Sequence, residues 1–174
     1  MKTLISILLL GLTPLAPAHC ATPGEVSVGG QLREAPMQGL NAASRMLSDY
    51  RGKPLIINVW ASWCGPCRAE MASLERLARR GEAKQFAVIG ISTDDYPDAA
   101  MGFLKRTSGA FEHFIDRRLL LENMLGADHI PLTLLIDAQG RVVNKVYGER
   151  DWDSAEALEL IRKSFRIAAS KAIK

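Results

Sequence analysis

The sequence is poor in the residues from which most protein metal sites are built. It contains three cysteines and three histidines among 174 residues. Only Cys64 and Cys67 stand at the spacing that two ligands of one zinc ion use. A second ligand pair is missing, because Cys20 and the histidines at positions 19, 113 and 129 are scattered along the chain. The composition therefore argues against a zinc-binding domain.

The sequence also lacks a block of charge of one sign and a long apolar run. Its 22 basic and 19 acidic residues are interspersed and leave a net charge of +3, so the composition indicates no nucleic-acid partner. The uncharged run over residues 3–18 has 16 residues and two prolines, which is short for a helix that crosses a bilayer. We therefore do not expect a retained membrane anchor.

Residues 1–18 have the features of a secretory signal peptide. Lys2 precedes an apolar stretch over residues 4–12, and the small residues of an Ala-Pro-Ala sequence follow at 16–18, where a signal peptidase would cleave. Cys20 invites a lipoprotein interpretation, but the residues before it do not form a lipobox, which needs a branched apolar residue and then a small one. We therefore predict export to the periplasm.

The rest of the chain is predicted to form one domain. The sequence is 48% hydrophobic and 24% charged, which suits a globular protein that buries about two-thirds of its unfolded surface. Residues 19–32 begin the mature chain and are rich in Gly, Ser, Thr and Pro from residue 21, so we expect them to form a linker. The domain is then expected to occupy residues 33–174.

Residues 55–80 predict a buried strand that leads directly into a helix. Residues 55–60 are apolar except for Asn58, a pattern typical of a central strand covered on both faces. From residue 66 to residue 80 the apolar positions recur every three or four residues, and Gly81 follows as the stop signal. The two closely spaced cysteines lie at the junction of this strand and this helix.

Cys64 is predicted to cap the helix, with Gly65 in the turn and Pro66 at the first helical position. A sulfur at this place faces unpaired backbone N–H groups and the positive end of the helix dipole, which lowers the thiol pKa. The thiolate is the attacking species in disulfide exchange. Cys67 lies one turn further on, so the pair is predicted to act as nucleophile and resolving thiol. A structural disulfide and half of a zinc knuckle are the alternatives.

The remaining periodicity predicts an α/β fold with a mixed sheet flanked by helices. The apolar segments indicate further strands at residues 33–40, 86–92, 111–116, 131–137 and 141–147, and helices or helical turns at residues 43–50, 97–107, 119–125 and 153–169. Asp153 and Glu156 are interpreted as a capping box. We interpret Asp94, Asp95 and Asp98 as caps of the helix that begins at residue 97, rather than as a metal cluster.

Over about residues 36–165 the sequence resembles the exported TlpA-like and ResA-like thiol-disulfide oxidoreductases of the thioredoxin superfamily. Residues 60–67 read Trp-Ala-Ser-Trp-Cys-Gly-Pro-Cys and are similar to the active-site run of that superfamily. The pair Ile130-Pro131 resembles its cis-proline loop, and Glu70 stands where many members carry a glutamate in an active-site cavity. The 37 residues at 93–129 leave room for the family's extra strand and helix. The resemblance implies a thioredoxin-like fold with this insertion before the cis-proline strand.

The resemblance also implies roles for single residues. Cys64 would be the nucleophile and Cys67 the resolving thiol. Glu70 follows Cys67 by three positions on one helix face, where its carboxylate could accept the thiol proton; a solvated helix glutamate is the alternative. Asn58 stands where cytoplasmic thioredoxin has a buried aspartate, which makes Glu70 the substitute proton acceptor. The substrate surface would consist of Trp63, Gly65, Pro66, Ile130 and Pro131.

The function implied is a periplasmic reductase that acts on disulfides of exported client proteins without a cofactor. Apocytochrome c, copper-site assembly proteins and clients of a general isomerase all fit, and a membrane electron donor would restore the dithiol. The Gly-Pro dipeptide between the cysteines is shared with thioredoxin, whose potential is about −270 mV, against about −120 mV for the oxidant DsbA. The alternative from another class is a copper-binding module that uses Cys64, Cys67 and His129.

Overall fold

The protein forms the mixed sheet that the sequence predicts. Its computed structural model describes residues 24–167, apart from the side chains at positions 81 and 82. Seven strands lie in the order β2-β1-β5-β4-β3-β6-β7, with β3, β4 and β5 parallel and β6 antiparallel to β3. The elements are β1 (Pro36–Gly39), β2 (Arg45–Met46), η1 (Leu47–Tyr50), β3 (Leu55–Trp60), α1 (Gly65–Arg79), η2 (Gly81–Gln85), β4 (Ala87–Ser92), α2 (Pro97–Leu104), β5 (Glu112–Ile115), α3 (Leu120–Leu125), β6 (Leu132–Ile136), β7 (Val142–Tyr147) and α4 (Ala155–Phe165).

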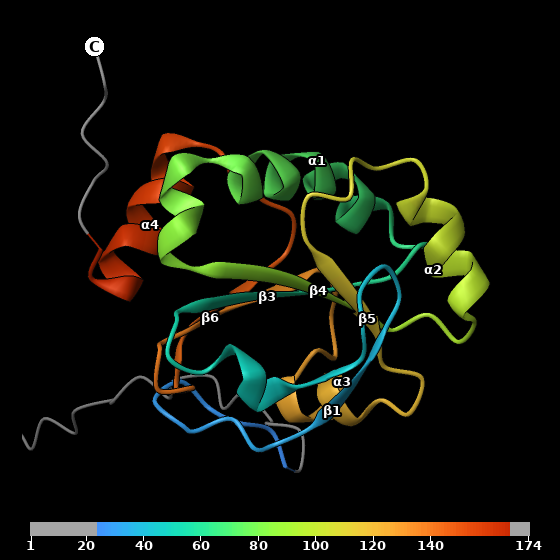
Figure 1. Ribbon diagram of the computed structural model, residues 1–174, viewed down its shortest axis with the longest axis horizontal. Coiled ribbons are helices and arrows are strands. Elements are labelled where there is room, and N and C mark those ends of the chain that lie inside the picture. The colour runs from blue at the N-terminus through green and yellow to red at the C-terminus, as the bar shows by residue number, and fades with distance from the viewer. Residues whose placement is uncertain (1–23, 168–174) are drawn as a thin grey trace, which may run out of the picture.

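Helices cover both faces of the sheet, as Figure 1 shows with α1 and α4 above the strands and α3 below them. The central strand β3 is buried at all six positions, and its side chains alternate between two apolar clusters. Ile56 and Trp60 pack with α1, α2 and α4, while Ile57 and Val59 pack with α3. Asn58 shares the α1 face, which places a polar side chain under the cysteine-bearing helix.

The N-terminal part of the described chain packs against the domain instead of forming a free linker. Val26 and Leu32 are buried in the cluster on the α3 face. Backbone hydrogen bonds join Gly29 N to Val142 O (2.7 Å) and Leu32 N to Gly140 O (3.0 Å). Residues 24–32 therefore extend the domain along β7. The predicted signal peptide, Cys20 and the rest of the expected linker lie outside the described residues.

Some helix starts differ from the sequence-based expectation. Ser154 caps α4 by accepting a hydrogen bond from Ala157 N (3.2 Å), whereas Asp153 forms ion pairs with Arg76 (3.1 Å) and Arg80 (2.6 Å) on α1. The predicted capping box is wrong because these two arginines, more than 70 residues away in the chain, hold the Asp153 carboxylate. No helix within residues 24–167 has the length and apolar character needed to cross a membrane.

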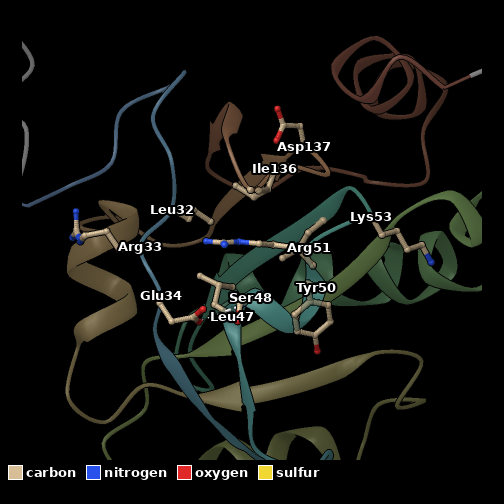
Figure 2. Close-up of a pocket in the computed structure, with 12 residues that line it drawn as sticks. Leu32, Arg33, Glu34, Leu47, Ser48, Tyr50, Arg51, Lys53, Ile136 and Asp137 are labelled. Atoms are coloured by element: carbon tan, nitrogen blue, oxygen red, sulfur yellow. Dashed lines mark hydrogen bonds between the residues drawn. The ribbon is translucent and has the colours of Figure 1, made fainter.

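A small cavity of about 20 Å³ lies at the edge of the sheet where β3 begins. Figure 2 shows Arg51 extended across it toward Leu32, with Lys53 and Asp137 nearby. The volume admits about one water-sized molecule. Because the cysteines follow the opposite end of β3, about 20 Å away for a six-residue strand, this cavity plays no part in their chemistry.

Candidate functional site

The junction of β3 and α1 positions the two cysteines as the sequence predicts. Cys64 has extended backbone angles and is the N-cap of α1, and its sulfur accepts a hydrogen bond from Cys67 N (3.2 Å). Pro66 lies in the first turn of this helix. Cys64 and Cys67 form a disulfide with an S–S distance of 2.01 Å and a Cα–Cα distance of 5.3 Å.

The two sulfurs differ in their access to solvent. Cys67 is fully buried, whereas Cys64 keeps 5% of its surface exposed and follows Trp63, which is 69% exposed. Nothing lies within 4 Å of the position that a Cβ atom would take on Gly65. A reactant from outside therefore meets Cys64 first, over an open surface with an aromatic side chain next to it.

The loop before β6 completes the surroundings of Cys64. The Ile130-Pro131 peptide bond is cis, as the sequence predicts. The carbonyl oxygen of Ile130 lies 3.8 Å from Cys64 Sγ, although the two residues are 66 positions apart. The structure thus brings together Cys64, Cys67, Ile130 and Pro131 at one edge of the sheet. Whether Trp63, Gly65, Pro66, Ile130 and Pro131 bind a substrate stays a prediction.

Glu70 lies under the disulfide-bearing turn and is 2% exposed, so the alternative of a solvated helix glutamate is wrong. Its Oε1 accepts a hydrogen bond from Asn58 Nδ2 (2.7 Å). Its Oε2 accepts hydrogen bonds from Arg150 N (3.1 Å) and from Trp152 Nε1 (3.2 Å). The carboxyl is therefore held by β3 on one side and by the loop before α4 on the other.

Burial raises the pKa of Glu70 to about 7, although its hydrogen bonds from Asn58, Trp152 and Arg150 act in the opposite direction. The nearby carboxylate of Glu149 raises the pKa further. A pocket of about 230 Å³ beside α1 is lined by Glu70, Glu149 and Arg150. A carboxyl that titrates near neutral pH, one helical turn from Cys67, can take up and return a thiol proton.

The sequence did not reveal Trp152 and Arg150 as partners of Glu70. Their contacts depend on a loop about 80 residues further along the chain. The only signal in the sequence is an aromatic residue, Trp152, directly before the predicted last helix. Its indole N–H is a polar group that needs an acceptor when it is buried, and Glu70 supplies that acceptor.

Asp94 supports the cysteine loop and does not cap α2, which corrects the sequence-based interpretation. Its carboxylate accepts hydrogen bonds from Ser62 N (2.9 Å), Ser62 Oγ (2.7 Å) and Ser92 Oγ (2.8 Å). The N-cap of α2 is Tyr96, without a side-chain cap, and Asp98 lies in the first turn. Asp94 therefore ties the segment before Cys64 to the end of β4.

His129, the third ligand of the copper alternative, is exposed, with Nδ1 3.3 Å from Asp128. Among residues 24–167, no three side chains of His, Cys, Asp or Glu gather in a way that could hold a metal ion.

The sequence profile of the Redoxin family matches residues 29–161, a range that contains the cysteine pair, the Ile130-Pro131 loop and Glu70. The chain belongs to the Redoxin family. Its relatives in the comparison include the thiol-disulfide oxidoreductase ResA of Bacillus cereus, which is 30% identical over 110 residues. That alignment covers 63% of this chain and 64% of the ResA protein, so this Redoxin chain matches less than two-thirds of that relative's length.

Other relatives match over a longer range. ResA of Geobacillus thermodenitrificans is 29% identical over 151 residues, which cover 85% of this chain and 86% of that protein. A candidate thiol:disulfide interchange protein DsbE from Chlorobium tepidum has a similar structure, with a TM-score of 0.73 and 26% identity. Its alignment covers 80% of this chain and 99% of that chain. The thioredoxin-like fold predicted from the sequence is confirmed.

Glu70→Gln is expected to change how the stability of the oxidised protein depends on pH. The pKa of Glu70 is raised from 4.5 to about 7 in the folded state, so folding favours the protonated form. This contribution to stability is complete below about pH 4.5 and is lost as the pH rises through 7. It amounts to about 3 kcal/mol for a shift of this size. The measurement is the free energy of unfolding in urea at pH 5 and pH 8. The wild type should lose stability between these pH values, and Glu70→Gln should lack this loss.

The matched control is Glu156→Gln, which replaces an exposed glutamate in the first turn of α4. This control should follow the wild-type pH dependence. Equal slopes for the wild type and Glu70→Gln would show that Glu70 does not titrate in this range.

Proposed function

We propose that the protein is a periplasmic thiol-disulfide oxidoreductase that reduces disulfides of exported client proteins. The observation that carries this proposal is the Cys64-Cys67 disulfide at the start of α1, with the more accessible sulfur next to the Ile130 carbonyl. The names of its ResA and DsbE relatives support the same type of reaction.

In the proposed reaction, the thiolate of reduced Cys64 attacks one sulfur of the client disulfide. A mixed disulfide forms between Cys64 and the client, and the client's other sulfur leaves as a thiolate. Cys67 then attacks the Cys64 sulfur, which restores the Cys64-Cys67 bond and releases the client's second sulfur. Two electrons pass to the client, and its two cysteine thiolates take up protons from solvent.

Glu70 is proposed to accept the proton of Cys67 during the second attack. The resolving sulfur is fully buried, so it cannot lose its proton directly to solvent. Glu70 follows Cys67 by one turn, and its pKa of about 7 allows both proton uptake and proton release at neutral pH. The pocket lined by Glu149 and Arg150 would return the proton to solvent.

The client is proposed to lie in extended form against the loop that precedes β6. Backbone groups of Ile130 and the faces of Pro131, Trp63, Gly65 and Pro66 surround the more accessible sulfur. An extended segment can pair with such a loop through its own backbone, so recognition would depend little on client sequence. This suits a reductase for apocytochrome c or for a copper-site assembly protein.

Export is proposed from residues 1–18, which have the pattern of a signal peptide. An oxidising compartment would return the cysteine pair to the disulfide, so a membrane electron donor must supply two electrons per cycle. The donor is a dithiol protein that is able to attack Cys64 over the same open surface.

The test is to incubate the reduced protein with a disulfide-bonded protein such as insulin and to titrate free thiols. One client disulfide should be reduced for each oxidised Cys64-Cys67 pair. Equilibration with glutathione buffers should give a potential nearer to the thioredoxin value of about −270 mV than to the DsbA value of about −120 mV. A Cys20→Ser variant is the control and should behave like the wild type. Absence of electron transfer, or a potential at the oxidising end, would contradict the proposal.

A further inference from the structure

The amide of Asn58 occupies an asymmetric position between two oxygens. Asn58 and Thr133 are direct partners across β3 and β6, so their side chains lie on one face. Nδ2 of Asn58 lies 2.7 Å from Glu70 Oε1 and 3.0 Å from Thr133 Oγ1. Oδ1 of the same amide is buried and has no hydrogen-bond partner among the described residues. In this orientation the amide therefore stabilises the ionised form of Glu70.

A neutral Glu70 needs a different partner on Oε1. Oε2 faces the N–H groups of Arg150 and Trp152, which donate and cannot accept a proton. The acid proton must therefore reside on Oε1, opposite Asn58, where the Nδ2 group present there cannot accept it either. The other charged groups near this carboxyl are Arg76, Glu149, Arg150 and Asp151 around the adjoining pocket, and Cys67 on its own helix titrates only when the disulfide is reduced.

We propose that Asn58 is a positioning residue that serves both protonation states of Glu70 by turning its amide end for end. With ionised Glu70, Nδ2 donates to the carboxylate and to Thr133 Oγ1. With neutral Glu70, Oδ1 of Asn58 takes the place of Nδ2. It then accepts one hydrogen bond from the Glu70 acid proton and one from the Thr133 hydroxyl group. The proton comes from Cys67 or from solvent, and no covalent bond between heavy atoms changes.

Each orientation leaves one end of the amide unpartnered, the carbonyl oxygen with ionised Glu70 and the NH₂ group with neutral Glu70. An amide presents a donor and an acceptor at nearly the same place after a half-turn, whereas an aspartate offers no N–H group and a leucine offers neither. Asn58 thereby lets a buried carboxyl change its charge while keeping a hydrogen bond in each state. This inference deepens the proposed function, since it concerns the same proton acceptor, but its test needs no client.

The test is NMR on the oxidised full-length protein, with the Asn58 side-chain NH₂ group and the Thr133 methyl group assigned. The NOE between these two groups should be strong above the titration midpoint of Glu70 and should weaken below it, with the same midpoint as the Glu70 carboxyl carbon. The matched control is Asn123, whose Nδ2 donates to Leu119 O (2.6 Å) on the exposed side of α3. The NOEs of its side-chain NH₂ group should stay constant through the Glu70 titration. A constant Asn58–Thr133 NOE through the titration would overturn the proposal.

A pair of variants gives a second measurement. Asn58→Leu removes the hydrogen bond of ionised Glu70 and also that of neutral Glu70, so the acid dissociation constant of Glu70 should fall by less than about tenfold, and Thr133→Val, which leaves the Asn58–Glu70 contact, should change that constant less. A fall of well over tenfold in Asn58→Leu would show that Asn58 stabilises the ionised form alone and would contradict the proposal. Should the leucine variant fail to fold, the NOE measurement on the wild type still decides. Both readouts are independent of disulfide exchange, so they stand apart from the test of the proposed function.

Discussion

Replacement of Cys64 by serine is expected to abolish disulfide exchange, with a loss of about 10³-fold or more, while Cys67→Ser should keep the first attack and accumulate mixed disulfides. The asymmetry follows from the structure, because Cys64 caps α1 and retains exposed surface, whereas Cys67 is fully buried. Only the outer sulfur can be reached by a client. Without Cys67, the mixed disulfide on Cys64 has no resolving thiol.

The measurement is non-reducing electrophoresis of cell extracts after acid quenching, followed by identification of proteins bound to Cys67→Ser. Cys64→Ser and the double variant are the controls and should trap no client. The trapped proteins would name the client class, which distinguishes cytochrome c maturation from copper-site assembly. Trapping by Cys64→Ser instead of Cys67→Ser would reverse the assignment of nucleophile and resolving thiol.

Acidification is expected to destabilise the protein through His113, and His113→Leu should remove much of that sensitivity. His113 is fully buried, its ring lies between Trp60 (centroids 5.4 Å apart) and Phe111 (4.3 Å), and neither ring nitrogen has a hydrogen-bond partner among the described residues. Burial lowers its pKa from 6.5 to about 4, although the charge of Glu75 acts in the opposite direction.

The direction in which stability changes with pH follows from this lowered pKa. The unfolded chain binds a proton on His113 below about pH 6.5, whereas the folded protein does so only near pH 4. Stability from this group is therefore complete above pH 6.5 and is lost as the pH falls toward 4, by about 3 kcal/mol in total. Chemical denaturation at pH 7 and pH 4.5 should show a smaller loss for His113→Leu than for the wild type. His129→Gln, at an exposed histidine, should lose as much as the wild type, and an equal loss in His113→Leu would refute the assignment.

The sequence predicted the parts of the fold that depend on local patterns. The continuous apolar run of β3, the three-and-four spacing of α1 and the turn chemistry of Gly65 and Pro66 are all local, and the structure has them within one or two residues. The role of Cys64 as the helix cap was also predicted from a local pattern, namely a cysteine directly before a Gly-Pro pair. These features needed no knowledge of distant segments.

The features that the sequence did not reveal depend on distant contacts. A helix or helical turn was expected over residues 43–50, but only Leu47–Tyr50 form one, because Arg45–Met46 pair with β1 as a short edge strand. Asp94 and Asp153 carry the composition of helix caps, yet Ser62 and the α1 arginines hold their carboxylates. The packing of residues 24–32 depends on β7, more than 100 residues away. None of these contacts could be predicted from composition and local patterns alone.

The order of strands in the sheet has a consequence for how this protein is made. β3 hydrogen-bonds to β6, so Asn58 meets Thr133, and Cys64 meets Ile130, across 75 and 66 residues of intervening chain. Contacts of such high sequence separation form late, because the chain must close a long loop before it gains them. A growing chain that ends before residue 130 carries both cysteines but lacks the Ile130-Pro131 loop that lies against Cys64. The proposed client site is therefore complete only after the chain has been made through β6.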